Sequence, residues 1–283
     1  MYLLDRTAGR KDFGNGSIFL QATLGTVLGI GAGFVLFPAE ASLIGVFLVA
    51  LAQHRTVEAL LDRNRDEIWG GAEGARGARG ANFRLAISLL VFFLGVLVTY
   101  SAATLLVPEA RLPDLFGRQL GDFDVVSITD VVFDDLGGIL GNNVLVMLAC
   151  FLFSLLYRHG GMLLVLAWNA SVWGVIFPYI ARTAPDRSAG AVVYFLKSFV
   201  SIFPHLLLEA VGYVLVAMAG VFLSKALQKY ELGSPRFTQV AGAVGRLVAL
   251  SALTLALLAG SASAGEIEFK DPAGDDKGHG KLV

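Results

Sequence analysis

The feature that most constrains this chain is a series of apolar runs, each about as long as a lipid bilayer is thick. A membrane-crossing helix needs about 20 consecutive apolar residues. Clear runs of this kind occur at 17–37, 85–107, 139–157, 162–180 and 240–263. Only 16% of the residues are charged, and the mean hydropathy is +0.68. The sequence therefore predicts an all-α integral membrane protein, because a helix satisfies its own backbone hydrogen bonds in lipid.

A further apolar run, 190–227, is too long for one straight crossing and contains Pro204. Proline lacks the backbone N–H and ends or kinks a helix, so we expect a short piece over 190–203 and a full span over 204–226. A shorter apolar stretch at 43–52 completes the pattern. The expected fold is a polytopic transmembrane helical bundle of about seven spans, with one broken helix near Pro204.

The polar continuation of the 43–52 stretch also has a helical pattern. Four apolar residues share one face at helical spacing, namely Val57, Leu60, Leu61 and Ile68. We expect a helix over 54–69 that lies along the membrane surface or against a partner. The segment that follows, "GGAEGARGARGANF" at 70–83, is rich in glycine and arginine, which is typical of a flexible linker.

These segments divide the chain into three parts. Residues 1–83 form an N-terminal helical hairpin with a cytoplasmic surface helix and the linker. Residues 84–264 form a five-span core that includes an acidic extracytoplasmic segment, 108–138. Within that segment we expect 122–135 to form a short strand or to pack against the membrane face. Residues 265–283 are a polar tail that we expect to be disordered.

Lysine and arginine gather near alternate ends of the expected spans. Because positively charged loops stay in the cytoplasm, we expect a multi-pass protein of the cell (inner) membrane with a cytoplasmic N-terminus and an extracytoplasmic C-terminus. The net charge is -1, which gives no reason to expect nucleic acid as a partner.

The sequence contains no complete catalytic motif. The single cysteine, Cys150, excludes an internal disulfide framework and a cysteine-based metal cage. No "HExxH" or "GxSxG" occurs. His159, in the turn "RHGG", fits a capping or interfacial residue better than a metal ligand. We therefore expect no enzyme activity, no cofactor and no metal site.

Several polar residues nevertheless fall within or beside the apolar runs, where an unpaired polar group costs several kcal/mol. On a helix, Glu209 lies on the same face as His205, four residues earlier, with Tyr213 one turn further. The candidate polar cluster consists of Asn142, Asn143, Asn169, His205, Glu209 and Tyr213. Lys197 and Arg246 are expected instead to extend their side chains toward the two membrane surfaces.

Three interpretations of this cluster remain open. The side chains can hydrogen-bond one another and fix the helix register, with His205 and Glu209 joining the helix of Asn169. They can form a binding or ion-handling site, which is the usual function of ionisable groups inside a membrane. An intramembrane hydrolase that uses Glu209 with His205 is the third interpretation, and it requires a cavity that water can reach.

Three stretches resemble the stage II sporulation protein M family. They are "LGNNVLVMLACFLFSLL" (140–156), "LAWNASVWGVIF" (166–177) and "FPHLLLEAVGYVLVAMAGVFLSKAL" (203–227). The paired asparagines, the single asparagine and the His–Glu pair match recurring polar positions of the family. Leu206 stands where the family commonly has glycine. The resemblance covers roughly 84–263 and leaves the first two spans outside.

The resemblance implies a polytopic helical protein of about five core spans. In spore formers, the family member is an envelope component that gathers peptidoglycan-remodelling enzymes, whereas most relatives occur in organisms that do not sporulate. We therefore expect a non-enzymatic integral membrane subunit that scaffolds or anchors an envelope complex. Its expected partners are the lipid bilayer, other membrane or envelope proteins and, as a further option, a second copy of the chain. The alternative is a transporter or permease subunit with a polar site around His205 and Glu209.

Overall fold

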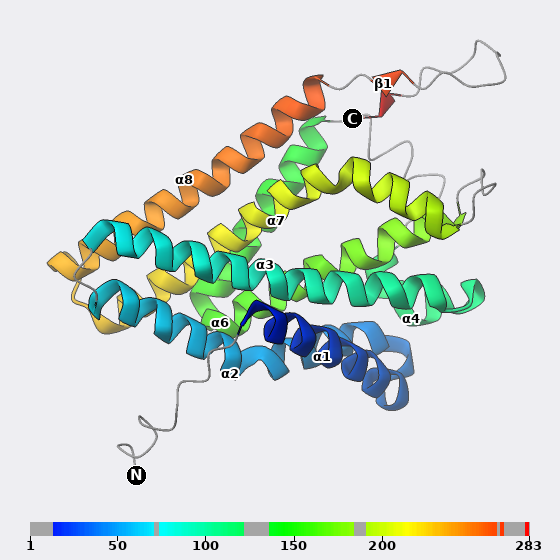
Figure 1. Ribbon diagram of the computed structural model, residues 1–283, viewed down its shortest axis with the longest axis horizontal. Coiled ribbons are helices and arrows are strands. Elements are labelled where there is room, and N and C mark those ends of the chain that lie inside the picture. The colour runs from blue at the N-terminus through cyan, green and yellow to red at the C-terminus, as the bar shows by residue number, and fades with distance from the viewer. Residues whose placement is uncertain are drawn as a thin grey trace.

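The computed structural model describes residues 14–70, 74–121, 136–183, 191–264, 267–268 and 281–282. The chain folds into long helices that pack side by side (Figure 1). They are α1 (Asn15–Leu36), α2 (Ala41–Gly70), α3 (Gly74–Leu106), α4 (Leu112–Leu120), α6 (Leu136–Thr183), α7 (Ala191–Lys229) and α8 (Pro235–Ala264). Two 3₁₀ turns, η1 (Pro38–Glu40) and η2 (Glu109–Arg111), precede α2 and α4.

Six of the described helices are long and apolar enough to cross a membrane, and all but the short α4 belong to this set. One of them, α6, consists of two arms, because Arg158 has non-helical dihedral angles of φ 55° and ψ -137°. The chain reverses there so sharply that Gly161 packs against the carbonyl of Phe153. Each arm, 136–157 and 159–183, is long enough to cross. The all-α membrane bundle is confirmed, and the turn predicted at "RHGG" lies where α6 reverses.

The expected break near Pro204 is wrong in its form. α7 continues as one helix from Ala191 to Lys229 with Pro204 inside it, and Figure 1 shows it as a bent rod. Membrane helices tolerate an internal proline when neighbouring groups satisfy the freed carbonyl. No free helix start therefore exists at Pro204.

The expectations for 54–83 also need correction. Val57 and Leu61 are buried inside the bundle of this chain, so the apolar face of 54–69 is covered intramolecularly. The predicted linker is helical from Gly74 onward. Asn64 donates to Asn82 Oδ1 at 3.0 Å, and this contact holds the polar parts of α2 and α3 together. At 1.5 Å per residue, α2 is about 45 Å long, so it extends beyond a hydrocarbon core of about 30 Å.

Glycines bring neighbouring helices into close contact. A Cβ added at Gly29 would lie 2.9 Å from the carbonyl oxygen of Gly45, across the α1–α2 interface. One added at Gly95 of α3 would lie 2.8 Å from the Cβ of Ala22. Small residues permit this approach, and dispersion contacts then stabilise helix pairs that lipid would not drive together.

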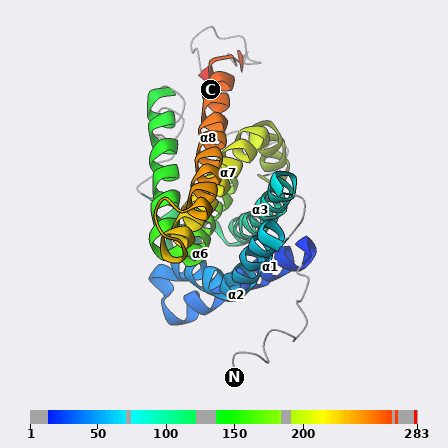
Figure 2. The ribbon, with the colours of Figure 1, turned by 90° about the vertical axis from the view of Figure 1, so that its left-hand side faces the viewer.

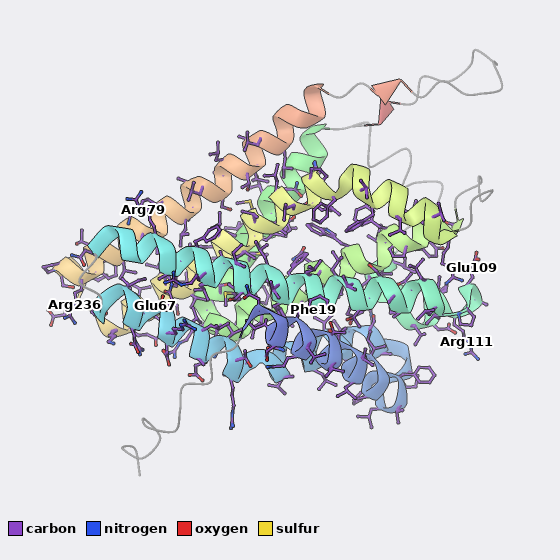
Figure 3. The ribbon with its side chains drawn as sticks, viewed as in Figure 1. Phe19, Glu67, Arg79, Glu109, Arg111 and Arg236 are labelled. Carbon is purple, nitrogen blue, oxygen red and sulfur yellow. The ribbon has the colours of Figure 1, made fainter. Side chains whose placement is uncertain are left out.

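The bundle has two charged ends. Glu67, Arg79 and Arg236 lie at one end, which we call the α2/α3 end, and Glu109 and Arg111 lie at the other, the α4 end (Figure 3). In the view turned by 90°, α8 runs beside α7 and away from α1 and α2 (Figure 2).

Beyond α8, two short strands, β1 (Ile267–Glu268) and β2 (Lys281–Leu282), pair antiparallel. The predicted strand at 122–135 and the remainder of the tail lie outside the described residues.

Candidate functional site

The predicted polar cluster is assembled in part, between the first arm of α6 and α7. The Tyr213 hydroxyl lies within hydrogen-bond distance of Glu209 Oε1, one turn earlier on α7. The same hydroxyl lies 3.3 Å from Asn143 Oδ1 on α6. A hydroxyl has one proton, so it donates to one acceptor at a time, and the carboxylate is the nearer of the two. The shorter contact therefore lies within α7, and the same hydroxyl faces Asn143 across the α6–α7 interface.

These three side chains are enclosed by the bundle. Tyr213 is 1% exposed, Asn143 5% and Glu209 9%. α8 closes the neighbouring face, where Ser251 Oγ donates to the carbonyl of Gly212 at 2.8 Å. Gly212 is required there, because an added Cβ would lie 2.5 Å from Thr254 Oγ1. Polar contacts therefore join α6, α7 and α8 at one level of the bundle.

The expected tie between the His205–Glu209 pair and the helix of Asn169 is wrong. Asn169 donates to the carbonyl of Val165 on its own helix, at 2.8 Å. Within the described part of the chain, no hydrogen bond joins Glu209 to His205 or to Asn169. His205 is half-buried. The side chains of Asn142 and Lys197 lie outside the described residues.

This arrangement limits the chemistry that Glu209 can perform. Its contact with a phenol on the same helix suits a carboxyl that holds a proton or fixes a helix. A hydrolase would need His205 or another base within about 3 Å of the reacting group. The described residues do not bring His205 and Glu209 together in this way.

A second buried polar network, at the α4 end, was not predicted. Tyr100 donates to the carbonyl of Ser42 at 2.6 Å. The hydroxyl of Ser42 hydrogen-bonds Gln119 of α4, and Gln119 Nε2 donates to Ser171 Oγ at 3.3 Å. Leu112 and Phe116 on the same face of α4 are fully buried. The start of the predicted extracytoplasmic segment is therefore a cap on the bundle.

An exposed ion pair holds this cap from outside. Arg118 of α4 donates from Nε to Glu40 Oε2 at 2.8 Å, and its Nη2 bonds the other carboxylate oxygen. The hydrogen bond from Arg118 lowers the pKa of the Glu40 carboxyl below its usual value. Sequence reasoning missed these contacts because the two residues are 78 positions apart.

A third cluster lies where α2 passes the turn of α6. His54 Nε2 and His159 Nε2 are 2.9 Å apart, and Glu58 lies close to both rings. His159, which was expected to be a capping or interfacial residue, has a buried side chain. The spacing of His54 and Glu58, four residues apart on one helix face, was the sequence signal for this cluster.

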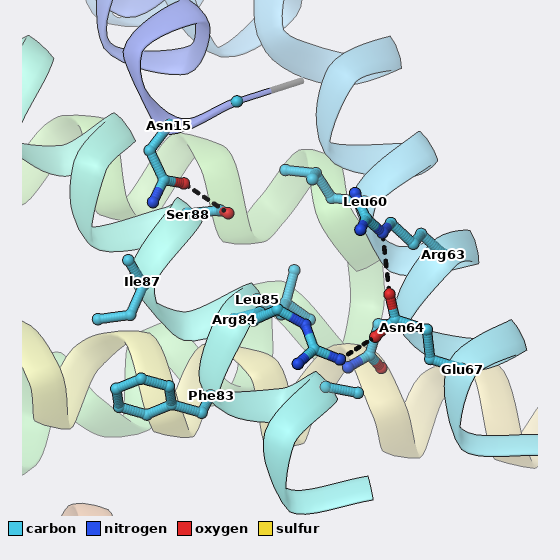
Figure 4. A pocket seen from close by; sticks show the side chains of 12 residues that line it. Asn15, Leu60, Arg63, Asn64, Glu67, Phe83, Arg84, Leu85, Ile87 and Ser88 are labelled. Carbon is cyan, nitrogen blue, oxygen red and sulfur yellow. Dashed lines mark hydrogen bonds and ion pairs between the residues drawn. The ribbon is translucent and has the colours of Figure 1, made fainter. Parts of the chain in front are cut away.

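A cavity of about 330 Å³ opens near the α2/α3 end, between the start of α1 and the polar parts of α2 and α3. Figure 4 shows Arg84 and Arg63 pointing toward Glu67, and Asn15 bonded to Ser88. Arg84 Nη2 lies 2.5 Å from Glu67 Oε2, so both basic groups already have an internal partner. None of the six residues of the candidate polar cluster lines this cavity.

The fold and these buried polar contacts define a polytopic all-α membrane protein whose helices are joined by intramembrane hydrogen bonds. A model of the family described as Stage II sporulation protein M matches residues 85–264, well over half of the 283 residues. The chain therefore belongs to this family. A search of curated proteins and a search of solved structures each returned no match. α1 and α2 precede the matched region and pack against it.

Proposed function

We propose that this chain is a non-enzymatic integral membrane subunit that scaffolds or anchors an envelope protein complex. The observation that carries the proposal is the use of the intramembrane polar groups: Glu209, Tyr213 and Asn143 meet at the α6–α7 interface, where the Tyr213 hydroxyl lies between the other two side chains. Because these buried polar groups contact other parts of the same chain, they are not available to partners. The charged ends of the bundle are then the surfaces to which partners can bind. Membership of the stage II sporulation protein M family supports an envelope role.

The two ends offer different docking chemistry. The α2/α3 end has a rigid helical tip in which Glu67 pairs with Arg84 and Asp62 pairs with Arg65 at 2.9 Å. Such exposed pairs contribute little stability, about 0–1 kcal/mol each, and they present an alternating charge pattern to a partner. The α4 end presents exposed Arg111.

Site-specific photo-crosslinking in cells tests the scaffold. A photoreactive residue replaces exposed Arg79 at the α2/α3 end or exposed Arg111 at the α4 end. The control is Leu28 of α1, which is 71% exposed on the apolar surface. The proposal expects one dominant protein adduct from an end position and none of that mass from Leu28. Adducts confined to lipid at all three positions would contradict it.

The proposed orientation has the α2/α3 end and the N-terminus in the cytoplasm, and the α4 end and the C-terminus outside. With the two arms of α6 counted separately, the described residues contain seven apolar helical segments. An odd number of crossings places the two termini on opposite sides of the membrane. Because Cys150 is buried, a cysteine introduced at Arg111 or Arg79 can be labelled selectively with a membrane-impermeant thiol reagent in intact cells. Labelling at Arg111 alone is expected, and labelling at Arg79 alone would reverse the orientation.

A transporter subunit is the second candidate, because Glu209 places an ionisable group within an apolar helix. In proteoliposomes, Glu209→Gln would then abolish substrate or proton flux while assembly persists. Under the scaffold proposal, the wild-type chain shows no flux that depends on Glu209.

A further inference from the structure

The cluster at the turn of α6 brings three potential metal ligands together. His54 and Glu58 lie one helical turn apart on α2, and His159 follows the reversal at Arg158. One ring nitrogen from each histidine and one carboxylate oxygen of Glu58 all lie within 4.8 Å of one another. The two histidine rings face each other with their centroids 4.1 Å apart.

The turn holds His159 in this position at a conformational cost. Arg158 has a positive φ of 55° and is the one non-glycine residue with a positive φ in the described part of the chain. A residue with a side chain rarely adopts this conformation. Gly160 lies beside α2, since an added Cβ would be in ordinary van der Waals contact with His54 Nδ1, at 4.0 Å.

Contacts within the protein leave one ring nitrogen of His159 without a hydrogen-bond partner. Its side chain is 8% exposed, and its Nδ1 atom is buried without a hydrogen-bond partner. A hydrogen bond between the two rings would use one proton and would not involve Glu58. Buried polar atoms without a partner are uncommon in native proteins. The Nδ1 atom is not the ring nitrogen that faces His54, so the ion is inferred from the two Nε2 atoms and the Glu58 carboxylate.

The distances fit a small transition-metal ion. With Zn–N bonds of about 2.0–2.1 Å, two ligands of a tetrahedral zinc ion lie about 3.3 Å apart. The two Nε2 atoms, 2.9 Å apart, need to separate by only a few tenths of an ångström. The three potential ligand atoms lie within 4.8 Å of one another, so the exposed Glu58 side chain moves toward the histidines to complete the site. Two histidines and one glutamate form a donor set that zinc uses when a fourth position is left to water. Glu58 is exposed, so an ion can enter from that side.

Neighbouring cations have other partners. Lys225 Nζ lies 3.7 Å from Asp62 Oδ1, and Arg158 donates to Gln228 Oε1. Asp62 partly offsets the charge of Lys225, which lowers the electrostatic cost of a bound cation, whereas the neutral Gln228 only fixes the position of the Arg158 side chain.

We infer that His54, Glu58 and His159 bind a divalent transition-metal ion of the zinc type. This ion fastens α2, which precedes the matched family region, to the turn of α6 inside that region. The inference concerns this site alone and is independent of the proposed scaffold function.

Metal titration of the full chain tests the site. The protein is purified in detergent, its affinity tag is removed, and it is stripped with a chelator and dialysed. Zinc content is then measured after equilibration with ZnCl₂, and CoCl₂ supplies a visible spectrum of the ligand environment. The expected result is one ion per chain and a melting temperature that zinc raises and the chelator lowers. A wild-type chain that retains no stoichiometric metal would overturn the inference without any variant.

Variants assign the ligands. Because even outer-shell changes weaken metal sites by about 10–100-fold, His54→Gln and His159→Gln should each weaken zinc binding by at least about 100-fold. Glu58→Gln should weaken it less and change the cobalt spectrum. The matched control is Glu231→Gln, an exposed carboxylate between α7 and α8, which should bind zinc as the wild type does. Unchanged binding by the His54→Gln/His159→Gln double variant would overturn the assignment.

Discussion

Replacing Tyr213 with phenylalanine removes one hydroxyl from the centre of the bundle and tests whether the intramembrane cluster is structural. The ring remains, so the packing against Trp173, whose ring centroid lies 6.1 Å away, is preserved. The change deletes the contact with Glu209 and the 3.3 Å contact with Asn143.

The magnitude follows from what each group loses. Interhelical hydrogen bonds in membranes average about 0.6 kcal/mol, with a maximum near 1.7, and a buried acceptor left unsatisfied costs about 1–3 kcal/mol. Glu209 is 9% exposed, so water restores little of the loss. We expect Tyr213→Phe to lower the free energy of unfolding by about 1–2 kcal/mol.

A double-mutant cycle with Glu209→Leu, which removes both acceptor oxygens, isolates the contact. Unfolding in mixed micelles of increasing denaturing-detergent fraction can be followed by tryptophan fluorescence, because Trp173 lies beside the cluster. We expect a coupling energy of about 1 kcal/mol between the two positions. The control is Tyr157→Phe, since Tyr157 is 66% exposed, and it should be neutral. A coupling energy within the usual additivity error of about 0.3–0.5 kcal/mol would refute the structural interpretation.

Three further predictions concern other parts of the chain. Gly174→Ala should destabilise the bundle by about 1–3 kcal/mol, because the new Cβ would lie 2.7 Å from the backbone of α3. The control Gly245→Ala, with no atom near the added Cβ, should be neutral or slightly stabilising. A similar loss of stability in both variants would contradict the packing. Arg158→Gly should raise the free energy of unfolding by up to about 1 kcal/mol, because glycine adopts positive φ without strain; a clear loss would show that the strain is absent. The pKa of Glu40 is lowered in the folded state. Its pairing with Arg118 therefore stabilises the folded protein above the unfolded pKa of about 4.3, and this stabilisation is lost as the pH falls through the folded pKa. The difference in melting temperature between wild type and Arg118→Gln should shrink on acidification, and a constant difference would contradict the pairing.

The spans were predictable because lipid imposes length and apolarity on every crossing segment. The reversal at Arg158 was also visible, since "RHGG" interrupts two apolar runs. The helix over 74–83 was not, because glycine composition alone indicates a linker. Contacts between α2 and α3, such as Glu67 with Arg84, stabilise the helix and are invisible in the local sequence.

The candidate site was predictable in part, because Asn143, Glu209 and Tyr213 lie together whereas Asn169 bonds its own helix. The spacing of Glu209 and Tyr213 fixes a shared face, and their contact was found. Whether that face meets Asn143 or Asn169 depends on how each helix is rotated, which one sequence does not specify. Pro204 was misjudged because the propensity of proline to break helices, derived from soluble proteins, applies less strongly inside a membrane. The His54–His159 contact joins positions 105 residues apart and required the folded structure.

The composition of the native particle tests the central claim most directly. The tagged chain is extracted from its own membrane together with surrounding lipid, in polymer nanodiscs, and the mass of the intact particle is measured. A scaffold whose charged ends hold partners should be recovered with a second polypeptide in a fixed ratio. Particles that contain only this chain and lipid would contradict the account.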